Sequence, residues 1–232
     1  MVKIYADGAD LAQIKRVYSE GLVEGFTTNP TLMKAAGVTD YLEFATEVLS
    51  EIKDMPISFE VFSDDFDEMY TQAKKLAQLG ENVYVKIPIT NTKGEFSEDL
   101  FRRLDLEGVK MNITAVFSIT QVRNLLKCLS GENPHIISVF AGRVADTGID
   151  PTRLMKTALD LMKEHSQLLE LLWASPREVL NVYQAEELGC DIITITPGMI
   201  NKLKLKDKDI EEYSLETVKM FYDDAQQAGY TL

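Results

Sequence analysis

The chain has 232 residues, of which 45% are hydrophobic, and this is enough for one large α/β barrel of about 200 to 250 residues. Its formal net charge of −13 at pH 7 argues against general binding to nucleic acid, because no broad basic face is available to displace counterions. No stretch approaches about 18 consecutive apolar residues, and the N-terminal MVKIYADGAD is not a signal peptide, so we expect no association with membranes.

Short apolar runs alternate with longer amphipathic stretches along the chain. The apolar runs predict strands at residues 2–6, 25–28, 57–62, 82–89, 110–116, 136–141, 169–174 and 192–196. The amphipathic stretches predict helices at residues 10–20, 41–53, 65–79, 97–106, 118–129, 151–166, 176–188 and 197–204. Eight strand–helix units in one chain predict an α/β fold of the (β/α)8 TIM barrel class.

Two helix starts carry cap signals. Ser175 followed by Pro176, with Glu178 as the third helical residue, predicts a capping box, and Asp150 before Pro151 repeats the signal. A doubly wound open sheet is the alternative architecture, but no Gly-x-Gly-x-x-Gly follows the first strand. No low-complexity linker interrupts the pattern, so we expect one domain over residues 1–232.

A last amphipathic segment, residues 214–228, predicts an additional C-terminal helix beyond the eighth unit. Its apolar stripe comprises Leu215, Val218, Phe221 and Tyr222. Two alternatives remain open at this point. The stripe covers its own barrel, or it contacts a neighbouring subunit.

The small number of cysteines and histidines limits the kinds of metal and thiol chemistry that the chain can carry out. Cys128 and Cys190 lie far apart in the sequence, which is typical of a reduced protein of the cytoplasm. His135 and His165 form no HxH or HExxH pattern, so we expect no zinc site, and no motif indicates a magnesium site.

The segment of residues 82–90, NVYVKIPIT, places Lys86 inside a run of strand-forming apolar residues. A charged ammonium is costly to bury, whereas a neutral amine is a nucleophile toward carbonyls. The segment therefore indicates a lysine that forms a Schiff base. Taken alone, the segment favours a lysine on the solvent side of an edge strand, because isolated strand lysines are common on edges.

Polar side chains follow the other predicted strands at the ends where barrel enzymes carry their chemistry. The set, with Lys86, comprises Asp7, Thr28, Asn29, Glu60, Asn112, Thr114, Ser138, Arg143, Ser175 and Arg177. Each has a structural alternative, such as a helix cap for Asp7 or a turn for Asn29. Together, a lysine, two carboxylates and a hydroxyl suit imine chemistry, and the serine and arginines near the last strands suit phosphate.

Several motifs resemble those of the transaldolase family, in its short single-barrel branch, along nearly the whole chain. They are YADGA (5–9), GFTTNPTL (25–32), FEV (59–61), VKIPIT (85–90), NITAVFS (112–118) and FAGR (140–143). The resemblance implies that Lys86 forms an imine with C2 of a ketose and that Asp7 moves the C4 hydroxyl proton. It implies that Glu60 and Thr114 hold a catalytic water, and it implies no metal or organic cofactor.

The resemblance also implies the contacts of the substrate. Thr28 and Asn29 would hydrogen-bond the sugar, and Asn112 would steady its dihydroxyacetone portion. The acceptor phosphate would lie among Ser138, Arg143, Ser175 and Arg177. A dihydroxyacetone unit would then pass from sedoheptulose 7-phosphate or fructose 6-phosphate to an aldose phosphate, in the pentose phosphate pathway. Family members commonly form homo-oligomers, as pentamers or decamers.

Two other functions remain open. A fructose-6-phosphate aldolase would release free dihydroxyacetone. The aldolase branch of the family, however, carries glutamine and tyrosine where this chain has Glu60 and Phe140. A catalytically silent barrel would most simply have lost Lys86. The chain departs from the common pattern at Val139 and over residues 173–177, WASPR, which includes Arg177, and these departures lie around the binding site for the acceptor.

Overall fold

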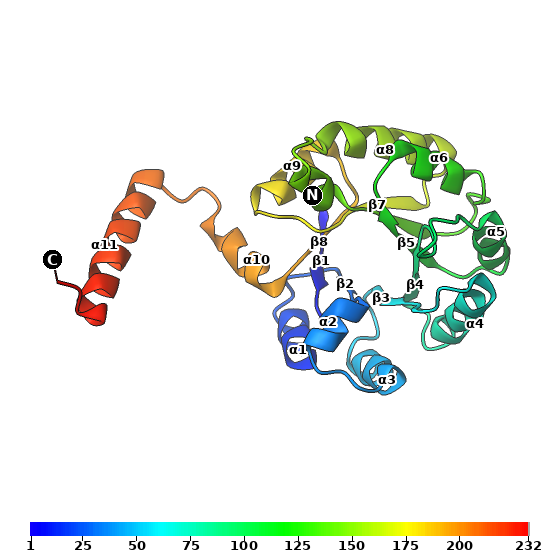
Figure 1. Ribbon diagram of the computed structural model, residues 1–232, viewed down its shortest axis with the longest axis horizontal. Coiled ribbons are helices and arrows are strands. Elements are labelled where there is room, and N and C mark those ends of the chain that lie inside the picture. Colours follow the sequence, from blue (N-terminus) through cyan, green and yellow to red (C-terminus); the bar gives the residue numbers. More distant parts are fainter. Residues whose placement is uncertain (232) are drawn as a thin grey trace. The chain divides into compact units, whose positions relative to one another are not determined.

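The computed structural model describes residues 1–231. The chain divides into two compact units, Met1–Ile200 and Asn201–Leu232. The first unit is a closed barrel of parallel strands that pair in chain order, with β8 returning to β1 (Figure 1). The strands are Lys3–Asp7 (β1), Gly25–Thr27 (β2), Ile57–Glu60 (β3), Val83–Pro88 (β4), Met111–Val116 (β5), His135–Val139 (β6), Leu169–Trp173 (β7) and Ile192–Ile195 (β8). The (β/α)8 TIM barrel fold is therefore confirmed.

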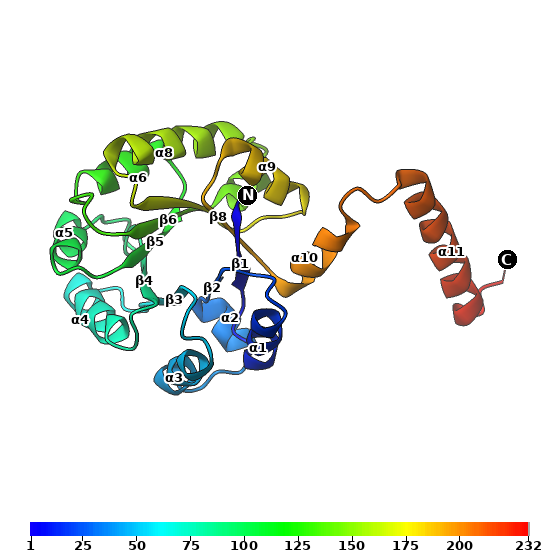
Figure 2. The same cartoon turned by 180° about the vertical axis from the view of Figure 1, so that it is seen from behind.

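The helices of this unit lie around the outside of the strands (Figures 1 and 2). They are Leu11–Ser19 (α1), Pro30–Ala35 (α2), Tyr41–Glu51 (α3), Phe66–Ala77 (α4), Glu98–Leu106 (α5), Ile119–Leu126 (α6), Ala141–Asp146 (α7), Thr152–His165 (α8) and Leu180–Leu188 (α9). Helix Pro197–Lys202 (α10) follows β8, runs from the first unit into the second, and continues into the 3₁₀ turn Leu203–Leu205. The short helices α2 and α7 are absent from the sequence prediction.

The predicted start of α9 is wrong by four residues. Ser175 has a φ of +61°, whereas the residue that caps a helix takes an extended backbone. The side chain of Asn181 instead accepts hydrogen bonds from the N–H groups of Arg177 and Glu178, at 2.8 and 3.2 Å. Helix α9 therefore begins at Leu180.

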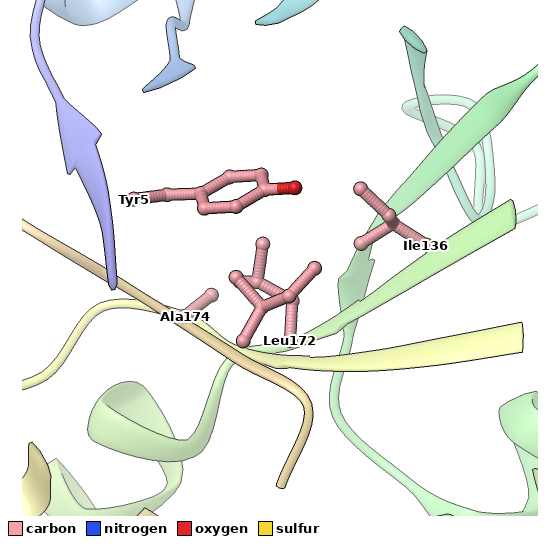
Figure 3. Packing of buried hydrophobic residues seen from close by; sticks show 5 residues of the cluster. Tyr5, Ile136, Leu172 and Ala174 are labelled. Carbon is pink, nitrogen blue, oxygen red and sulfur yellow. The ribbon is translucent and has the colours of Figure 1, made fainter. Parts of the chain in front are cut away.

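An apolar layer closes the inside of the barrel. The Tyr5 ring lies across the interior, with its hydroxyl directed toward Ile136 and with Leu172 close by (Figure 3). A Cβ atom on Gly25 would come within 2.5 Å of this ring, so only glycine leaves room for it. Side chains two residues apart on a strand share a face. Asp7 lies two positions after Tyr5 on β1. It therefore belongs to the next layer of side chains, toward the carboxyl ends of the strands.

The second unit contains one long helix, Ile210–Ala228 (α11), which begins four residues before the predicted segment. The Asp209 side chain caps it by accepting hydrogen bonds from the N–H groups of Glu211 and Glu212, both at 2.9 Å. Gly229, with a φ of +67°, ends it in the left-handed conformation. Across residues 1–231, none of the helices is both long enough and apolar enough to cross a membrane.

Candidate active site

Lys86 lies inside the barrel near the carboxyl end of β4. Its side chain is 8% exposed. Its Nζ lies 3.2 Å from Oε2 of Glu60, on the adjacent strand, and donates a hydrogen bond to the Thr28 carbonyl oxygen at 3.1 Å. Because β4 pairs on both sides in a closed barrel, Lys86 is not on an edge strand. A buried ammonium is costly unless it is paired, and here one carboxylate and one carbonyl oxygen supply that pairing.

Asp7 ends β1 and faces the same interior. Burial raises the pKa of its carboxyl above the usual range, an effect partly offset by the positive charge of Lys86 and a hydrogen bond from Thr27. Helix α1 is capped by Asp10, which accepts a hydrogen bond from the N–H of Gln13 at 2.9 Å. Asp7 therefore does not serve as this cap, and its carboxyl combines burial with a raised pKa, as a general acid–base requires.

Hydroxyl groups that the sequence did not single out surround Asp7. The Thr27 hydroxyl donates to Oδ1 of Asp7 at 2.7 Å and lies 2.5 Å from the Thr194 hydroxyl. The neighbouring Thr28 hydroxyl instead donates to the Ser58 carbonyl oxygen at 2.8 Å. Of the two adjacent threonines, Thr27 therefore lines the interior, while Thr28 contacts Lys86 through its carbonyl oxygen.

Asn112 links three strands beneath the cavity. Its Nδ2 donates to the Ser58 hydroxyl at 2.9 Å, and its Oδ1 accepts from the Ser138 hydroxyl at 2.6 Å. All three side chains are buried. This chain of hydrogen bonds holds Ser138 in one orientation.

The Thr114 hydroxyl is buried and, within residues 1–231, has no hydrogen-bond partner. The next residue, Ala115, has a φ of +58°, and the pairing of β5 with β6 shifts register between Ile113 and Val116. Leaving a buried hydroxyl unpaired costs about 1–3 kcal/mol. Such a group is available to bind a water molecule or a substrate oxygen.

These side chains converge on one small cavity of about 90 Å³. Its lining consists of Asp7, Thr27, Asn29, Lys86, Thr114, Ser138, Phe140, Arg143, Leu172, Ala174, Ser175 and Thr194. Most of the residues expected from the sequence are among them, and Glu60, Thr28 and Asn112 contact members of the set. Asn29 also caps α2 by accepting a hydrogen bond from the N–H of Leu32 at 3.0 Å, so it has a structural role as a helix cap, whereas its structural alternative was a turn residue.

The mouth of the cavity combines aromatic and cationic groups. The Arg143 guanidinium lies 5.3 Å from the centre of the Phe140 ring, and the Phe117 ring lies 5.5 Å from the same ring. Arg177 does not line the cavity. Its guanidinium forms a two-bond contact with the carboxylate of Asp146. Of these two arginines, Arg143 is therefore the one that can contact an anionic group at this mouth.

His135 is buried outside this cavity. Its Nε2 lies 2.8 Å from Oδ1 of Asp105, and its Nδ1 accepts a hydrogen bond from the N–H of Met111 at 3.2 Å. Burial alone would raise the pKa of Asp105, but hydrogen bonds from His135, Asn133 and Ser130 outweigh it and hold the pKa well below the usual range. The described residues, 1–231, contain no group of three or more His, Cys, Asp or Glu side chains arranged to hold a metal ion.

Comparison with known proteins gives a consistent result. Residues 4–232 match the family model described as Transaldolase/Fructose-6-phosphate aldolase. The chain is 36% identical over 205 residues to a probable transaldolase of Nitrosopumilus maritimus, covering 87% of each protein. It is 35% identical over 215 residues to a probable transaldolase of Methanococcus maripaludis strain C7, covering 91% of this chain and 95% of that protein.

A solved structure shares the fold at low sequence identity. KGPDC from Streptococcus mutans superposes with a TM-score of 0.59 at 10% identity, over 87% of this chain and 90% of that one. This likeness supports the barrel architecture alone, since barrels host many unrelated reactions.

Proposed function

The chain belongs to the Transaldolase/Fructose-6-phosphate aldolase family, and we propose that it transfers a dihydroxyacetone unit through an imine on Lys86. The donor is sedoheptulose 7-phosphate or fructose 6-phosphate, and the acceptor is an aldose phosphate. The observation that carries the proposal is the buried amine of Lys86 beside Glu60, in a cavity that also contains the carboxyl of Asp7. We place the reaction in the cytoplasm, as part of the pentose phosphate pathway.

The first step is addition of the Lys86 amine to the C2 carbonyl of the ketose. The Glu60 carboxylate, 3.2 Å from Nζ, accepts the proton that the ammonium must lose before its nitrogen can attack. Loss of the C2 oxygen as water then gives the protonated imine. We propose that the unpaired hydroxyl of Thr114 and the Glu60 carboxylate bind this water molecule. The same two groups bind the water that later hydrolyses the imine.

The second step breaks the bond between C3 and C4. Asp7 removes the C4 hydroxyl proton, the electron pair of the broken bond moves into the imine to give an enamine, and the aldose product leaves. Because burial raises the pKa of Asp7, its carboxyl holds this proton more readily than an exposed aspartate would. It delivers the proton to the acceptor's carbonyl oxygen as the enamine carbon attacks that aldehyde.

The size of the cavity suits a three-carbon unit. A site of about 90 Å³ holds roughly six or more water-sized atoms, when each needs about 10–15 Å³ on the same measure. Dihydroxyacetone has six non-hydrogen atoms. The Asn29 and Ser138 side chains line this space and can hydrogen-bond its hydroxyl groups.

The remaining part of a longer sugar extends to the mouth. There Arg143 and Ser175 supply a guanidinium and a hydroxyl to the acceptor's phosphate. The Phe140 ring beside Arg143 leaves no hydroxyl at this position, unlike the tyrosine expected of an aldolase.

Helix α11 supports a further part of the proposal, that the protein forms a homo-oligomer, as a pentamer or a decamer. None of its described side chains is buried, and it bears apolar residues at Leu215, Val218 and Phe221. Contact with another copy of the chain would remove this apolar surface from water.

The transfer reaction is tested by mixing the purified protein with fructose 6-phosphate and erythrose 4-phosphate and following both products by mass spectrometry. The proposal predicts sedoheptulose 7-phosphate and glyceraldehyde 3-phosphate in equal amounts, with little free dihydroxyacetone. Cleavage of fructose 6-phosphate without an acceptor, with stoichiometric release of free dihydroxyacetone, would instead identify the aldolase activity.

A further inference from the structure

Helix α7 touches the segment that follows β7 at its first turn. A Cβ atom on Gly142 would lie 1.5 Å from the Ser175 carbonyl oxygen, so no larger residue fits unless one of the two segments moves. The Gly142 N–H also donates a hydrogen bond to the Ala174 carbonyl oxygen at 3.3 Å. The first turn of α7 is therefore held against the residues that lead into Ser175.

The last residue of α7 is joined to the same segment by an ion pair. Asp146 accepts a hydrogen bond from Nε of Arg177 at 2.9 Å and a second one from Nη2. This two-bond geometry fixes both the distance and the orientation of the two side chains. A half-exposed pair adds little to global stability, but it sets the spacing of the two segments that it joins.

The backbone between these two contacts is strained. Ser175 adopts a φ of +61°, which is unfavourable for a residue with a side chain and persists where the surroundings enforce it. Gly142 contacts the carbonyl oxygen of Ser175, and Arg177 lies two residues further on. The contacts at both ends of α7 therefore maintain the conformation that directs Ser175.

Helix α7 and the segment that follows β7 carry the polar groups at the mouth of the cavity. Arg143 follows Gly142 in α7, and both Arg143 and Ser175 line the cavity. Arg177 does not, and its guanidinium is occupied by Asp146. The two arginines thus differ in what they face, since one is directed to the cavity and the other to a carboxylate.

We propose that Gly142, Asp146 and Arg177 are positioning residues that hold Arg143 and Ser175 at the spacing that a phosphate group requires. Arg177 acts through Asp146 and does not contact the phosphate. The inference rests on the proposed function, because the phosphate belongs to the acceptor of that reaction.

The test compares Arg177→Met, Asp146→Asn and the double variant. The KM is measured for erythrose 4-phosphate and for unphosphorylated erythrose, with fructose 6-phosphate as the donor. We expect each single change to raise the ratio of the phosphorylated to the unphosphorylated KM by about two- to fivefold, the range for a half-exposed ion pair. The double variant should be no worse than either single variant, because both changes break one contact.

Direct contact between Arg177 and the phosphate gives the opposite pattern. Asp146→Asn would then free the guanidinium and leave the KM ratio unchanged or lower, while Arg177→Met would raise the ratio alone. That result overturns the proposal, as does an unchanged ratio in every variant. Arg102→Met, which breaks a comparably exposed ion pair with Glu98 on α5, is the matched control and should leave the ratio at its wild-type value.

Gly142→Ala provides a second measurement, with an expected rise of at least tenfold in the same ratio. If this variant does not fold, the ion-pair variants decide. The same proteins are titrated with inorganic phosphate, whose binding needs no chemistry. If the wild-type protein forms no adduct on Lys86, the proposed function fails, but weaker phosphate binding by Asp146→Asn still supports the positioning role. Phosphate affinity equal in all variants, or absent from the wild-type protein, overturns it.

Discussion

We expect Thr114→Val to make the protein more stable and its reaction slower. The hydroxyl of this residue is buried without a hydrogen-bond partner in the part of the chain that the structure describes. An unpaired buried polar group costs about 1–3 kcal/mol, and valine replaces it with a methyl group of similar size. In a protein of this length, each kcal/mol corresponds to about 2–4 °C in Tm. A gain of about 2 °C or more is therefore expected in scanning calorimetry.

The same change should slow formation of the imine. A hydrogen bond to the neutral water molecule contributes about 0.5–1.5 kcal/mol, which corresponds to a factor of roughly 2 to 13 in rate. The rate is followed by quenching the reaction with borohydride at short times and measuring the reduced adduct.

Thr28→Val is the matched control for stability. The Thr28 hydroxyl is equally buried but donates to the Ser58 carbonyl oxygen at 2.8 Å, so its removal should lower stability by about 1 kcal/mol. If Thr114→Val melts below the wild-type protein and forms the imine at the wild-type rate, the hydroxyl is structural and the role assigned to it is refuted.

Three other changes test separate parts of the account. Asp7→Asn should still form the imine, but its rate of cleavage should fall at least about a hundredfold. Because burial raises the pKa of Asp7, the Tm of this variant should exceed that of the wild-type protein by more at pH 7 than at about pH 4. An equal difference in Tm at both pH values would argue against the raised pKa. Asp105→Asn should lower the free energy of unfolding by about 1.5–3 kcal/mol at neutral pH. Because the pKa of Asp105 is depressed, this difference between variant and wild-type protein should shrink as the pH falls below about 4. A difference that stays constant with pH in urea unfolding would contradict the depressed pKa. Phe140→Tyr should raise the release of free dihydroxyacetone relative to transfer, and an unchanged ratio in a product assay would count against the role of this ring.

The strands could be predicted well because each buried strand is a short apolar run bounded by polar residues. The helices α2 and α7 could not, since six residues are too few to display a helical period. The start of α9 was wrong because Ser175 and Pro176 carry a cap signal that the left-handed backbone at Ser175 overrides. A sequence pattern does not reveal such a conformation when the residue is not glycine.

The composition of the site was more predictable than its orientation. Thr27 and Thr28 are adjacent and identical, and the sequence does not state which of them faces the barrel interior. The alternation of β2 settles it, because Gly25 must face the Tyr5 ring and Thr27 lies two residues further on the same side. Counting from Gly25 could therefore have identified Thr27 as the partner of Asp7.

The position of Arg177 follows from contacts distant in sequence. Its partner, Asp146, lies 31 residues earlier, and the close approach of Gly142 to Ser175 brings the two segments together. Sequence spacing alone carries no information on this ion pair.

The imine on Lys86 is tested most directly by borohydride reduction in the presence of fructose 6-phosphate, followed by mass mapping of the peptides. The account predicts a reduced three-carbon or six-carbon adduct on Lys86, and its loss in Lys86→Ala with the circular dichroism spectrum unchanged. An adduct on another lysine, or none on correctly folded protein with several ketose donors, would contradict it.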